Sequence, residues 1–367
     1  MATGRIPAVT GVSHICLPGP GGNSGNVLHA MMARRLLQHH DELSRVRPWA
    51  DEEVERVQAT NSHIVVVVAN ALRLGATPSS ISGHHDMMAQ NFSRVDLPLV
   101  VMSAGAQAPK RNSIADGIVV PEATIRLFKL LSKRSHAIAV RGDFTAEVLR
   151  GIGVDNTEVI GCQSCCCSLQ PEFPTSFEEA KSRTEVAYNC TSVARERNLV
   201  ELAVQNGYQT FGQEHPVENA ILRGDESGLD AEWPWGVLFS RTSVTREAFV
   251  AYIKETYRHH YELETWSPAM KEFRFSFGSR FHGNMVAMHA GVPSLWVAHD
   301  TRTEDLTSHL RLPSIALDEA MSFKHTEQFI ERADYSEFLK AYPHNYRRLS
   351  DFLERAGLPQ VLPPPVV

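Results

Sequence analysis

The sequence predicts an α/β fold with two domains in tandem, each built on a parallel sheet, and three observations support this. The chain has 367 residues, which is more than one hydrophobic core usually accommodates. Short apolar runs such as Ile64–Val68 are continuous and β-branched, as in strands that are buried on both faces of a parallel sheet. Segments with helical spacing follow these runs, and the alternation resumes after a segment that contains Pro171 and Pro174.

This alternation divides the chain into four parts. We expect a first domain over residues 1–165, a linker over 166–184 and a second domain over 185–325. Residues 326–367 should be helical up to Arg355 and then form an extended, proline-rich tail. We expect this C-terminal segment to pack back on the first domain.

The composition argues against several classes of protein. Hydrophobic residues make up 43% of the chain and charged residues 21%, as in globular proteins. A net charge of -6 argues against a general nucleic-acid binder, and no apolar run approaches the ~20 residues of a membrane span. The N-terminus lacks the charged start and long apolar core of a signal peptide. We therefore expect a cytoplasmic protein.

Four of the six cysteines crowd into the segment Cys162–Cys167, which is a poor layout for a disulfide framework. A C-x-x-C spacing marks zinc or redox sites in some proteins, but no second Cys or His pair lies here at zinc-finger spacing. We interpret the cluster as buried packing in a protein of a reducing compartment, and we expect no metal site.

A glycine-rich turn lies near the N-terminus, between the apolar run Val12–Leu17 and a segment with helical spacing, Val27–Gln38. Strand, glycine turn and helix in this order are typical of a loop that approaches a phosphate or a substrate, here with Asn23 and Asn26 in the turn. The spacing matches neither the P-loop nor the dinucleotide-binding motif, so an ordinary tight turn explains it equally well.

A second polar segment of the first domain, Ser79–Asp86, contains His85 and Asp86. We expect either a substrate loop or a metal cluster here. An adjacent pair of histidines cannot easily bind one ion without further ligands, which argues against the metal.

Arg141 directly follows the apolar run His136–Val140, which is predicted to be a strand. Asp143 is placed to cap the helix that comes next. Arg141 should therefore lie at the carboxyl end of a strand, either in a binding site or on the surface beside an acidic partner.

The second domain continues the same alternation of strands and helices. Strands are predicted at Glu185–Asn189, Tyr208–Phe211, Tyr261–Thr265, Arg274–Phe277 and Ser294–Ala298. Helices are predicted at Ser192–Gln205, Val244–His259 and Ser267–Glu272.

The turn around Arg280 is the most informative stretch of the chain. It follows a predicted strand, and Met285–Ala290 is predicted to form a helix, so the turn should lie where open α/β sheets bind ligands. Ser279 is expected to cap this helix and to place Arg280 and His282 in its first turn, where free N–H groups favour an anion. Arg280 adds a cation suited to phosphate or carboxylate, and His282 adds a proton donor that titrates near neutrality. The alternative is an ordinary helix start.

A third arginine, Arg302, comes shortly after the predicted strand Ser294–Ala298. Two parallel domains in tandem form a cleft between their ligand-binding crevices. Three arginines near strand ends, together with His282, suit a small dianion that carries phosphate and carboxylate groups. The residues by themselves do not identify that dianion.

The motif Arg280-Phe281-His282, followed by Gly291-Val292-Pro293 and then by Arg302, resembles the polysaccharide pyruvyl transferase family. That family has an Arg-Phe-His or Arg-Leu-His turn, a helix that ends in Gly-Val-Pro, and a basic residue about twenty residues after the histidine. Val140–Asp143 resembles its Val-Arg-Asp segment, and Gly22–Asn26 resembles its Gly-Asn-x-Gly-Asp turn. The resemblance covers roughly residues 10–310.

For the donor side, this resemblance implies two Rossmann-like domains similar to the glycosyltransferase type B (GT-B) fold, and phosphoenolpyruvate as co-substrate without a further cofactor. The enolpyruvyl group would pass to a pair of sugar hydroxyls, forming a pyruvate ketal and releasing phosphate. His282 would be the general acid. Arg280, Arg141 and Arg302 would bind the phosphate and carboxylate and stabilise the leaving phosphate.

For the acceptor side, the resemblance implies a glycan or a lipid-linked sugar that enters from the first domain, near Asn23, Asn26 and the segment Ser79–Asp86. His85 and Asp86 are candidates for the base that deprotonates a sugar hydroxyl. A lipid-linked acceptor would bring the protein into peripheral contact with a membrane. Two departures from the family matter, because Asn26 replaces an aspartate and Arg302 replaces a lysine and cannot donate a proton.

Two other functions fit the same residues. A glycosyltransferase that uses a nucleotide sugar also places arginines and helix N-termini around a diphosphate, and Glu304 or Asp305 would then bind the ribose hydroxyls. A catalytically inactive, sugar-binding relative would keep the fold while Asn26 and Arg302 replace the usual residues.

Overall fold

The structure is a computed structural model of the chain, and it describes residues 9–10, 28, 32, 36, 42–43, 47–69, 71–74, 79–108, 119–213, 216–260 and 262–358. The predicted strand Val12–Leu17 and the turn that contains Asn23 and Asn26 lie outside the described residues. Within the segment Val27–Gln38, the three described residues are helical, buried and four positions apart, as one face of a helix requires: Leu28, Met32 and Leu36.

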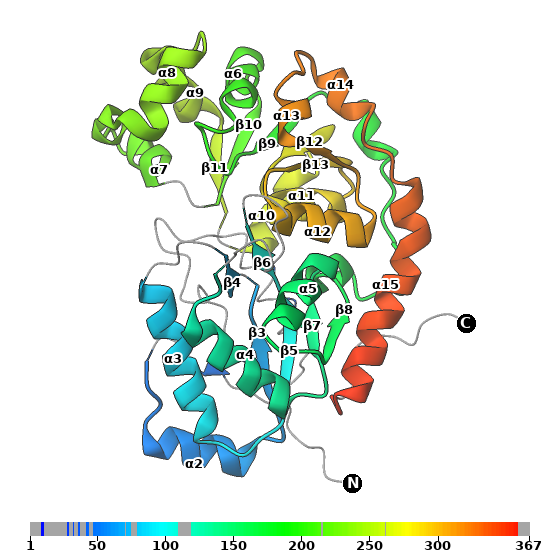
Figure 1. Ribbon diagram of the computed structural model, residues 1–367. Coiled ribbons are helices and arrows are strands. Elements are labelled where there is room, and N and C mark those ends of the chain that lie inside the picture. The colour runs from blue at the N-terminus through cyan, green and yellow to red at the C-terminus, as the bar shows by residue number, and fades with distance from the viewer. Residues whose placement is uncertain are drawn as a thin grey trace.

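The N-terminal domain is built on a six-stranded parallel sheet with the strand order β2-β1-β3-β5-β7-β8. Its strands are β1 (Val9–Thr10), β2 (Glu42–Leu43), β3 (Ile64–Val67), β5 (Leu99–Ala104), β7 (Ile138–Val140) and β8 (Thr157–Val159). Two short strands, β4 (Leu72–Arg73) and β6 (Ala106–Gln107), pair with each other beyond the carboxyl ends of β3 and β5. Both strands lie on the side of the N-terminal domain that faces the second domain (Figure 1).

The C-terminal domain has a second six-stranded parallel sheet with the order β11-β10-β9-β12-β13-β14. Its strands are β9 (Val186–Asn189), β10 (Gln209–Gly212), β11 (Tyr257–His259), β12 (Phe275–Gly278), β13 (Ser294–Ala298) and β14 (Ser314–Ala316). This order is that of a Rossmann sheet, and it reverses between β9 and β12, which opens a crevice at their carboxyl ends. The prediction of two Rossmann-like domains of GT-B type is therefore confirmed.

Helices cover both sheets (Figure 1). In the N-terminal domain they are α2 (Asp51–Thr60), α3 (Ser79–Ser93), α4 (Glu122–Arg134) and α5 (Asp143–Gly151). In the C-terminal domain they are α6 (Arg197–Asn206), α7 (Pro216–Leu222), α8 (Val237–Arg241), α9 (Arg246–Thr256), α10 (Leu263–Met270), α11 (Phe281–His289), α12 (Thr301–Leu310), α13 (Leu317–Ala320) and α14 (Thr326–Ile330). Short helical turns occur at Gln163–Cys166, Glu179–Ser182, Ser227–Asp230 and Glu232–Gly236. None of the helices in the described part of the chain combines the length and apolarity that crossing a bilayer requires.

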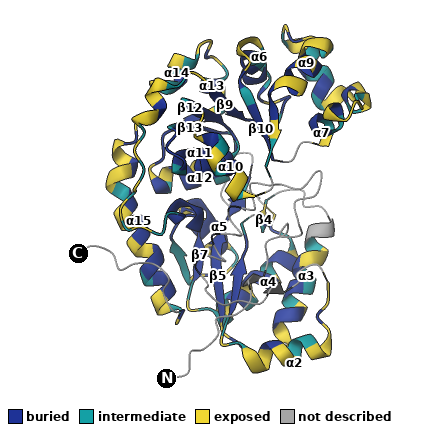
Figure 2. Cartoon of the chain, turned by 180° about the vertical axis from the view of Figure 1, so that it is seen from behind, coloured by how far each residue is buried: buried dark blue, intermediate teal, exposed yellow. Residues whose placement is uncertain are grey.

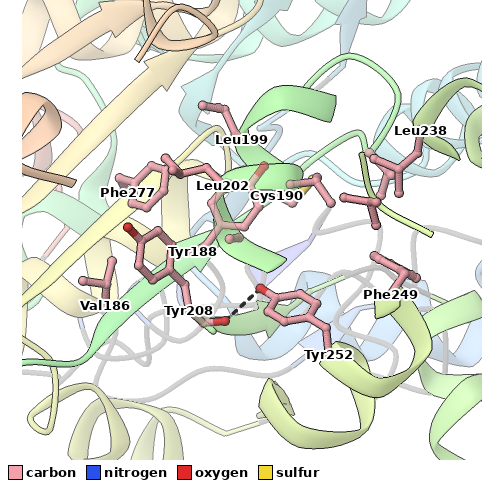
Figure 3. Close-up of a cluster of buried hydrophobic side chains, with 14 of the residues drawn as sticks. Val186, Tyr188, Cys190, Leu199, Leu202, Tyr208, Leu238, Phe249, Tyr252 and Phe277 are labelled. Atoms are coloured by element: carbon pink, nitrogen blue, oxygen red, sulfur yellow. Dashed lines mark hydrogen bonds between the residues drawn. The ribbon is translucent and has the colours of Figure 1, made fainter. Parts of the chain in front are cut away.

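Aromatic side chains fill the space between the second sheet and its helices (Figure 3). The rings of Tyr188 on β9 and Phe277 on β12 lie 5.1 Å apart. Tyr252 on α9 donates a hydrogen bond to the carbonyl oxygen of Tyr208 at 2.8 Å, so its buried hydroxyl is satisfied. Each large side chain buried in this way contributes roughly 1.5–3 kcal/mol. The packed face holds the carboxyl ends of β9 and β12 in fixed positions.

The last helix, α15 (Ser336–Arg355), runs along the side of both domains (Figure 1). Its second half packs on the N-terminal sheet, where Tyr346, Leu349 and Phe352 are buried against residues such as Val65. Its outer face is exposed (Figure 2). The segment before the second sheet also packs on this helix, since the ring of Phe173 lies 5.1 Å from that of Phe338.

The predicted strand Tyr261–Thr265 is wrong. The strand is β11, which lies within the segment predicted to be helical, and α10 begins at Leu263. Helix α9 ends at Thr256 because Tyr257 adopts an extended backbone and is buried in the sheet. Helical spacing alone did not reveal this strand, because burial in a sheet overrides local propensity.

Two further details differ from the sequence prediction. Ser79–Asp86 is not a loop but the start of α3, whose buried face continues through His85, Met88 and Phe92. The N-cap of α5 is Gly142, and Asp143 is the first residue of the helix rather than its cap.

Candidate functional site

The site begins at the carboxyl end of β12, where Gly278 has a φ of +135°. A Cβ atom here would lie 2.3 Å from the carbonyl oxygen of Asn189, so only glycine fits. The next residue, Ser279, does not cap α11 as predicted, because the N-cap is Arg280. The hydroxyl of Ser279 instead donates to Oε1 of the buried Glu196 at 2.6 Å.

Glu196 ties two turns of the site together. Its Oε1 also accepts the backbone N–H groups of Thr191 and Ser192, at 2.8 and 2.9 Å, in the turn after β9. The same carboxylate therefore fixes the turn after β9 and the turn after β12, on the two sides of the point where the strand order reverses.

Arg280 lies across this crevice. Its Nε donates to the carbonyl oxygen of Cys190, the residue after β9, at 3.2 Å. The guanidinium thus belongs to the turn after β12 but is held by the end of β9. This places a permanent cation at the ligand-binding edge of the sheet, as the sequence predicted for the turn.

The first turn of α11 is packed against polar side chains of the sheet. A Cβ atom on Gly283 would lie 2.1 Å from Oδ1 of Asn189. The amide nitrogen of Asn189 donates to Oδ1 of Asn284 at 3.0 Å. These buried contacts fix the position of the first turn of α11, which carries His282, against β9.

His282 is buried, and its Nε2 lies 4.0 Å from the Sγ atom of Cys162. Burial lowers the pKa of His282 well below its usual value, and the charges of Arg141 and Arg302 lower it further. The expectation that this group titrates near neutrality is therefore wrong for the free protein. Without a bound anion, burial and the two arginine charges favour the neutral imidazole of His282.

Arg141 follows β7 and reaches the same place from the N-terminal domain. Its side chain is almost fully enclosed, with the residue 3% exposed. One Nη atom points to Sγ of Cys162 at 3.9 Å, and Nε has no hydrogen-bond partner among the described residues. Among the residues that the structure describes, no carboxylate forms an ion pair with it. An enclosed cation without a counter-charge is costly, and a bound anion removes the cost.

Arg302 lies in the first turn of α12, and its Nη2 is 3.5 Å from Oδ2 of Asp300. Burial lowers the pKa of Arg302, Asp300 raises it, and the charges of Arg141, Arg280 and Arg73 lower it again. The structure thus brings together all four residues that were predicted for the donor site, Arg141, Arg280, His282 and Arg302. The positive charges of the arginines repel one another, and a buried cluster with perturbed pKa values of this kind is a candidate functional site.

Three residues that neighbour this site were not predicted from the sequence to do so. Cys162 lies between Arg141 and His282. Arg73, on β4, is close enough to lower the pKa of Arg302. Glu218, on α7, is buried, and burial raises its pKa to about 7 although the charge of Arg280 opposes the rise. No motif marks Arg73 or Glu218, because each reaches the site only through the folded arrangement.

Replacing Glu218 with glutamine should change how stability depends on pH. Between its ordinary pKa of 4.5 and the folded value of about 7, the unfolded chain loses this proton first, so rising pH destabilises the wild type. Above that window, Glu218→Gln should be more stable than the wild type by on the order of 3 kcal/mol, and the difference should vanish at acid pH. Urea unfolding across the window measures this, and a difference that stays constant with pH would contradict it.

Of the four residues proposed for the acceptor side, the structure describes His85 and Asp86, and both contact α4. His85 is buried and its Nδ1 lies 2.8 Å from Oγ1 of Thr124, so it joins α3 to α4. Asp86 forms an exposed ion pair with Arg126 at 2.7 Å between the same helices. Asn23 and Asn26 lie outside the described residues.

The described cysteines are free and buried. Burial raises the pKa values of the Cys165 and Cys166 thiols, which makes them poor nucleophiles. Cys166 packs between the first sheet and α15, and Cys165 and Cys167 pack in the core around α11. Within the described ranges, no three His, Cys, Asp or Glu side chains come together in a way that could hold a metal ion.

The comparison with protein families agrees with the resemblance that these motifs carry. The sequence model of the polysaccharide pyruvyl transferase family matches residues 23–301. No curated protein matches the sequence.

Among solved structures, S. aureus MnaA with UDP is similar at 10% identity and a TM-score of 0.49, over 99% of each chain. The UDP-GlcNAc 2-epimerase of Methanocaldococcus jannaschii is similar at 10% identity and a TM-score of 0.45, over 95% of this chain and 99% of that one. The wall teichoic acid polymerase TagF is similar at 12% identity and a TM-score of 0.41, over 96% of this chain and 90% of that one. Likenesses this distant carry no argument about what the chain binds.

Proposed function

Because this chain belongs to the polysaccharide pyruvyl transferase family, we propose that it transfers the enolpyruvyl group of phosphoenolpyruvate to two hydroxyls of a sugar. The product is a pyruvate ketal, and phosphate is released. The observation that carries the proposal is the enclosed guanidinium of Arg141, which has no carboxylate partner among the described residues and lies beside His282 and two more arginines.

Phosphoenolpyruvate suits this arrangement because it carries a phosphate and a carboxylate on one small carbon frame. Arg280 at the end of the second sheet and Arg141 from the first domain offer planar forks for these two groups. Arg302 adds a third positive charge for the phosphate as it leaves. An arginine cannot give up its proton here, so the proposal assigns Arg302 an electrostatic role only.

His282 is the proposed general acid. It protonates the methylene carbon of the donor, an oxocarbenium-like centre forms, and a sugar hydroxyl attacks it; the second hydroxyl then takes the place of the phosphate. One hydroxyl proton replaces the proton that His282 gave to the new methyl group, and the other leaves with the phosphate, so the reaction needs no net proton. The bound donor's negative charge offsets Arg141 and Arg302, which raises the pKa of His282 toward the value that a general acid requires.

The acceptor is proposed to be a glycan or a lipid-linked glycan precursor that enters from the N-terminal domain in the cytoplasm. A lipid-linked acceptor would require only peripheral contact with a membrane. Asn23 and Asn26 stay in the proposal as acceptor-side residues. His85 and Asp86 engage α4, so the proposal gives neither residue the role of base.

Release of phosphate from phosphoenolpyruvate tests this function. We expect release that depends on an acceptor when the protein is incubated with phosphoenolpyruvate and a panel of nucleotide-linked and lipid-linked sugars. Arg302→Ala should lower that rate by at least about tenfold, because a charge near the leaving phosphate contributes a few kcal/mol to transition-state stability. Full activity in Arg302→Ala would contradict the donor site, and Arg126→Ala on the exposed surface is the matched control.

A further inference from the structure

Helix α12 belongs to the C-terminal domain but is bound to the N-terminal domain at its first residues. The hydroxyl of Thr301 accepts the N–H of Ala108 at 2.9 Å, and the N–H of Thr301 donates to the carbonyl oxygen of Ala108 at 3.2 Å. The amide of Gln107 donates to Oδ2 of Asp300 at 3.0 Å. Arg302 therefore stands on a helix that both domains hold.

One turn further along α12, Asp305 caps a helix of the other domain. Asp305 is 2% exposed. Its carboxylate accepts the N–H groups of Phe144 and Thr145, at 3.0 and 3.2 Å, and the hydroxyl of Thr145 at 3.1 Å. These N–H groups belong to the first turn of α5, whose own N-cap, Gly142, has no side chain to offer. A carboxylate at this position satisfies free donors and interacts favourably with the helix dipole.

Gly142 makes room for that carboxylate. A Cβ atom on this residue would lie 2.2 Å from Cγ and 2.3 Å from Oδ1 of Asp305. The backbone of Gly142 is extended, with φ -171°, so an alanine could adopt its conformation. The glycine is needed for space, and it directly follows Arg141.

We propose that Asp305 is a positioning residue which, by capping α5 from the opposite domain, sets Arg141 against Arg302 so that both can bind one anion. Asp305 lies one turn from Arg302 on α12, and its hydrogen bonds hold the helix that begins two residues after Arg141. A single carboxylate thus fixes the two arginines that come from different domains. The inference rests on the proposed function, because the anion in question is the donor.

Calorimetry with phosphoenolpyruvate on the full chain tests this inference. Asp305→Ala should raise the dissociation constant by about tenfold or more, because α5 loses its cap and Arg141 is then free to move away from the anion. Gly142→Ala keeps Asp305 but displaces its carboxylate, so it should weaken binding in the same way. Asp305→Asn keeps one acceptor oxygen and should raise the dissociation constant less than Asp305→Ala does. Arg355→Ala, which removes an ion pair to Glu158 at 2.5 Å, is the control and should bind like the wild type.

The measured quantities separate positioning from simple stability. A purely structural role would lower the unfolding temperature and the fraction of protein able to bind, but it would leave the dissociation constant of the folded fraction unchanged. Unchanged dissociation constants in both Asp305→Ala and Gly142→Ala, with tight binding by the wild type, would overturn this inference alone. A wild type that does not bind phosphoenolpyruvate would overturn the proposed function, and this inference with it.

Discussion

Arg141→Met is expected to make the ligand-free protein more stable while it strongly weakens binding of phosphoenolpyruvate. The guanidinium is enclosed and has no carboxylate partner among the described residues, so the folded state bears the cost of a buried charge. Replacing a buried ion pair with apolar side chains of similar volume is often neutral or stabilises proteins by about 1–4 kcal/mol, and a buried charge without a partner costs more than a paired one. The same change should weaken donor binding by at least about 100-fold, because removing one partner of a buried charged contact costs 2–5 kcal/mol or more.

Urea unfolding without ligand and calorimetry with phosphoenolpyruvate measure the two effects. Arg126→Met is the matched control, because Arg126 is exposed and pairs with Asp86, and its loss should change neither quantity by much. A lower stability of Arg141→Met than of the wild type would contradict this prediction. It would mean that the cation has a partner which stabilises the fold. Binding retained by this variant would remove Arg141 from the donor site.

His282→Gln is expected to bind the donor but to lose turnover by about 100-fold or more, the contribution of a well-placed general acid. In the free protein, burial and the charges of Arg141 and Arg302 keep the pKa of His282 well below 6.5, so the imidazole is neutral at pH 7. A bound anion offsets those charges and raises this pKa. Donor binding near neutral pH should therefore be coupled to uptake of a proton.

Calorimetry in buffers of different ionisation enthalpy counts that proton. The wild type should take up close to one proton per donor bound, and His282→Gln should take up clearly less. Glu218 also titrates near the site, with a pKa of about 7, so Glu218→Gln serves as the control that separates its share. Equal uptake by the wild type and His282→Gln would show that the histidine stays neutral in the complex, and its role as general acid would be lost.

The sequence predicted the parts of the site that local patterns encode. Each arginine of the donor site follows a short apolar run that the structure shows as a strand, and parallel strands bring their carboxyl ends to one edge. Arg280 and His282 were found because β12, the turn and α11 are contiguous in the chain. The approach of Arg141 from the other domain was expected from the cleft between two parallel domains, and the resemblance to a family then assigned this arginine to the donor.

Other parts depend on contacts between distant residues and were not predictable. Ser279 has the composition of an N-cap, but the buried Glu196 takes its hydroxyl. Asp143 has the position of a cap for α5, but Asp305, 160 or more residues away, supplies the carboxylate. His282 has an ordinary pKa in any isolated peptide, and the shift appears only when folding buries it between two arginines. Local sequence propensity does not encode these long-range hydrogen bonds or this pKa shift.

The most direct test of the central claim is calorimetry of the wild-type protein with phosphoenolpyruvate, inorganic phosphate and a panel of nucleotide sugars. The account predicts that phosphoenolpyruvate binds to one site per chain, more tightly than phosphate alone, and that Arg280→Ala removes this binding. Binding of a nucleotide sugar without binding of phosphoenolpyruvate, or an Arg280→Ala variant that binds the donor like the wild type, would contradict it.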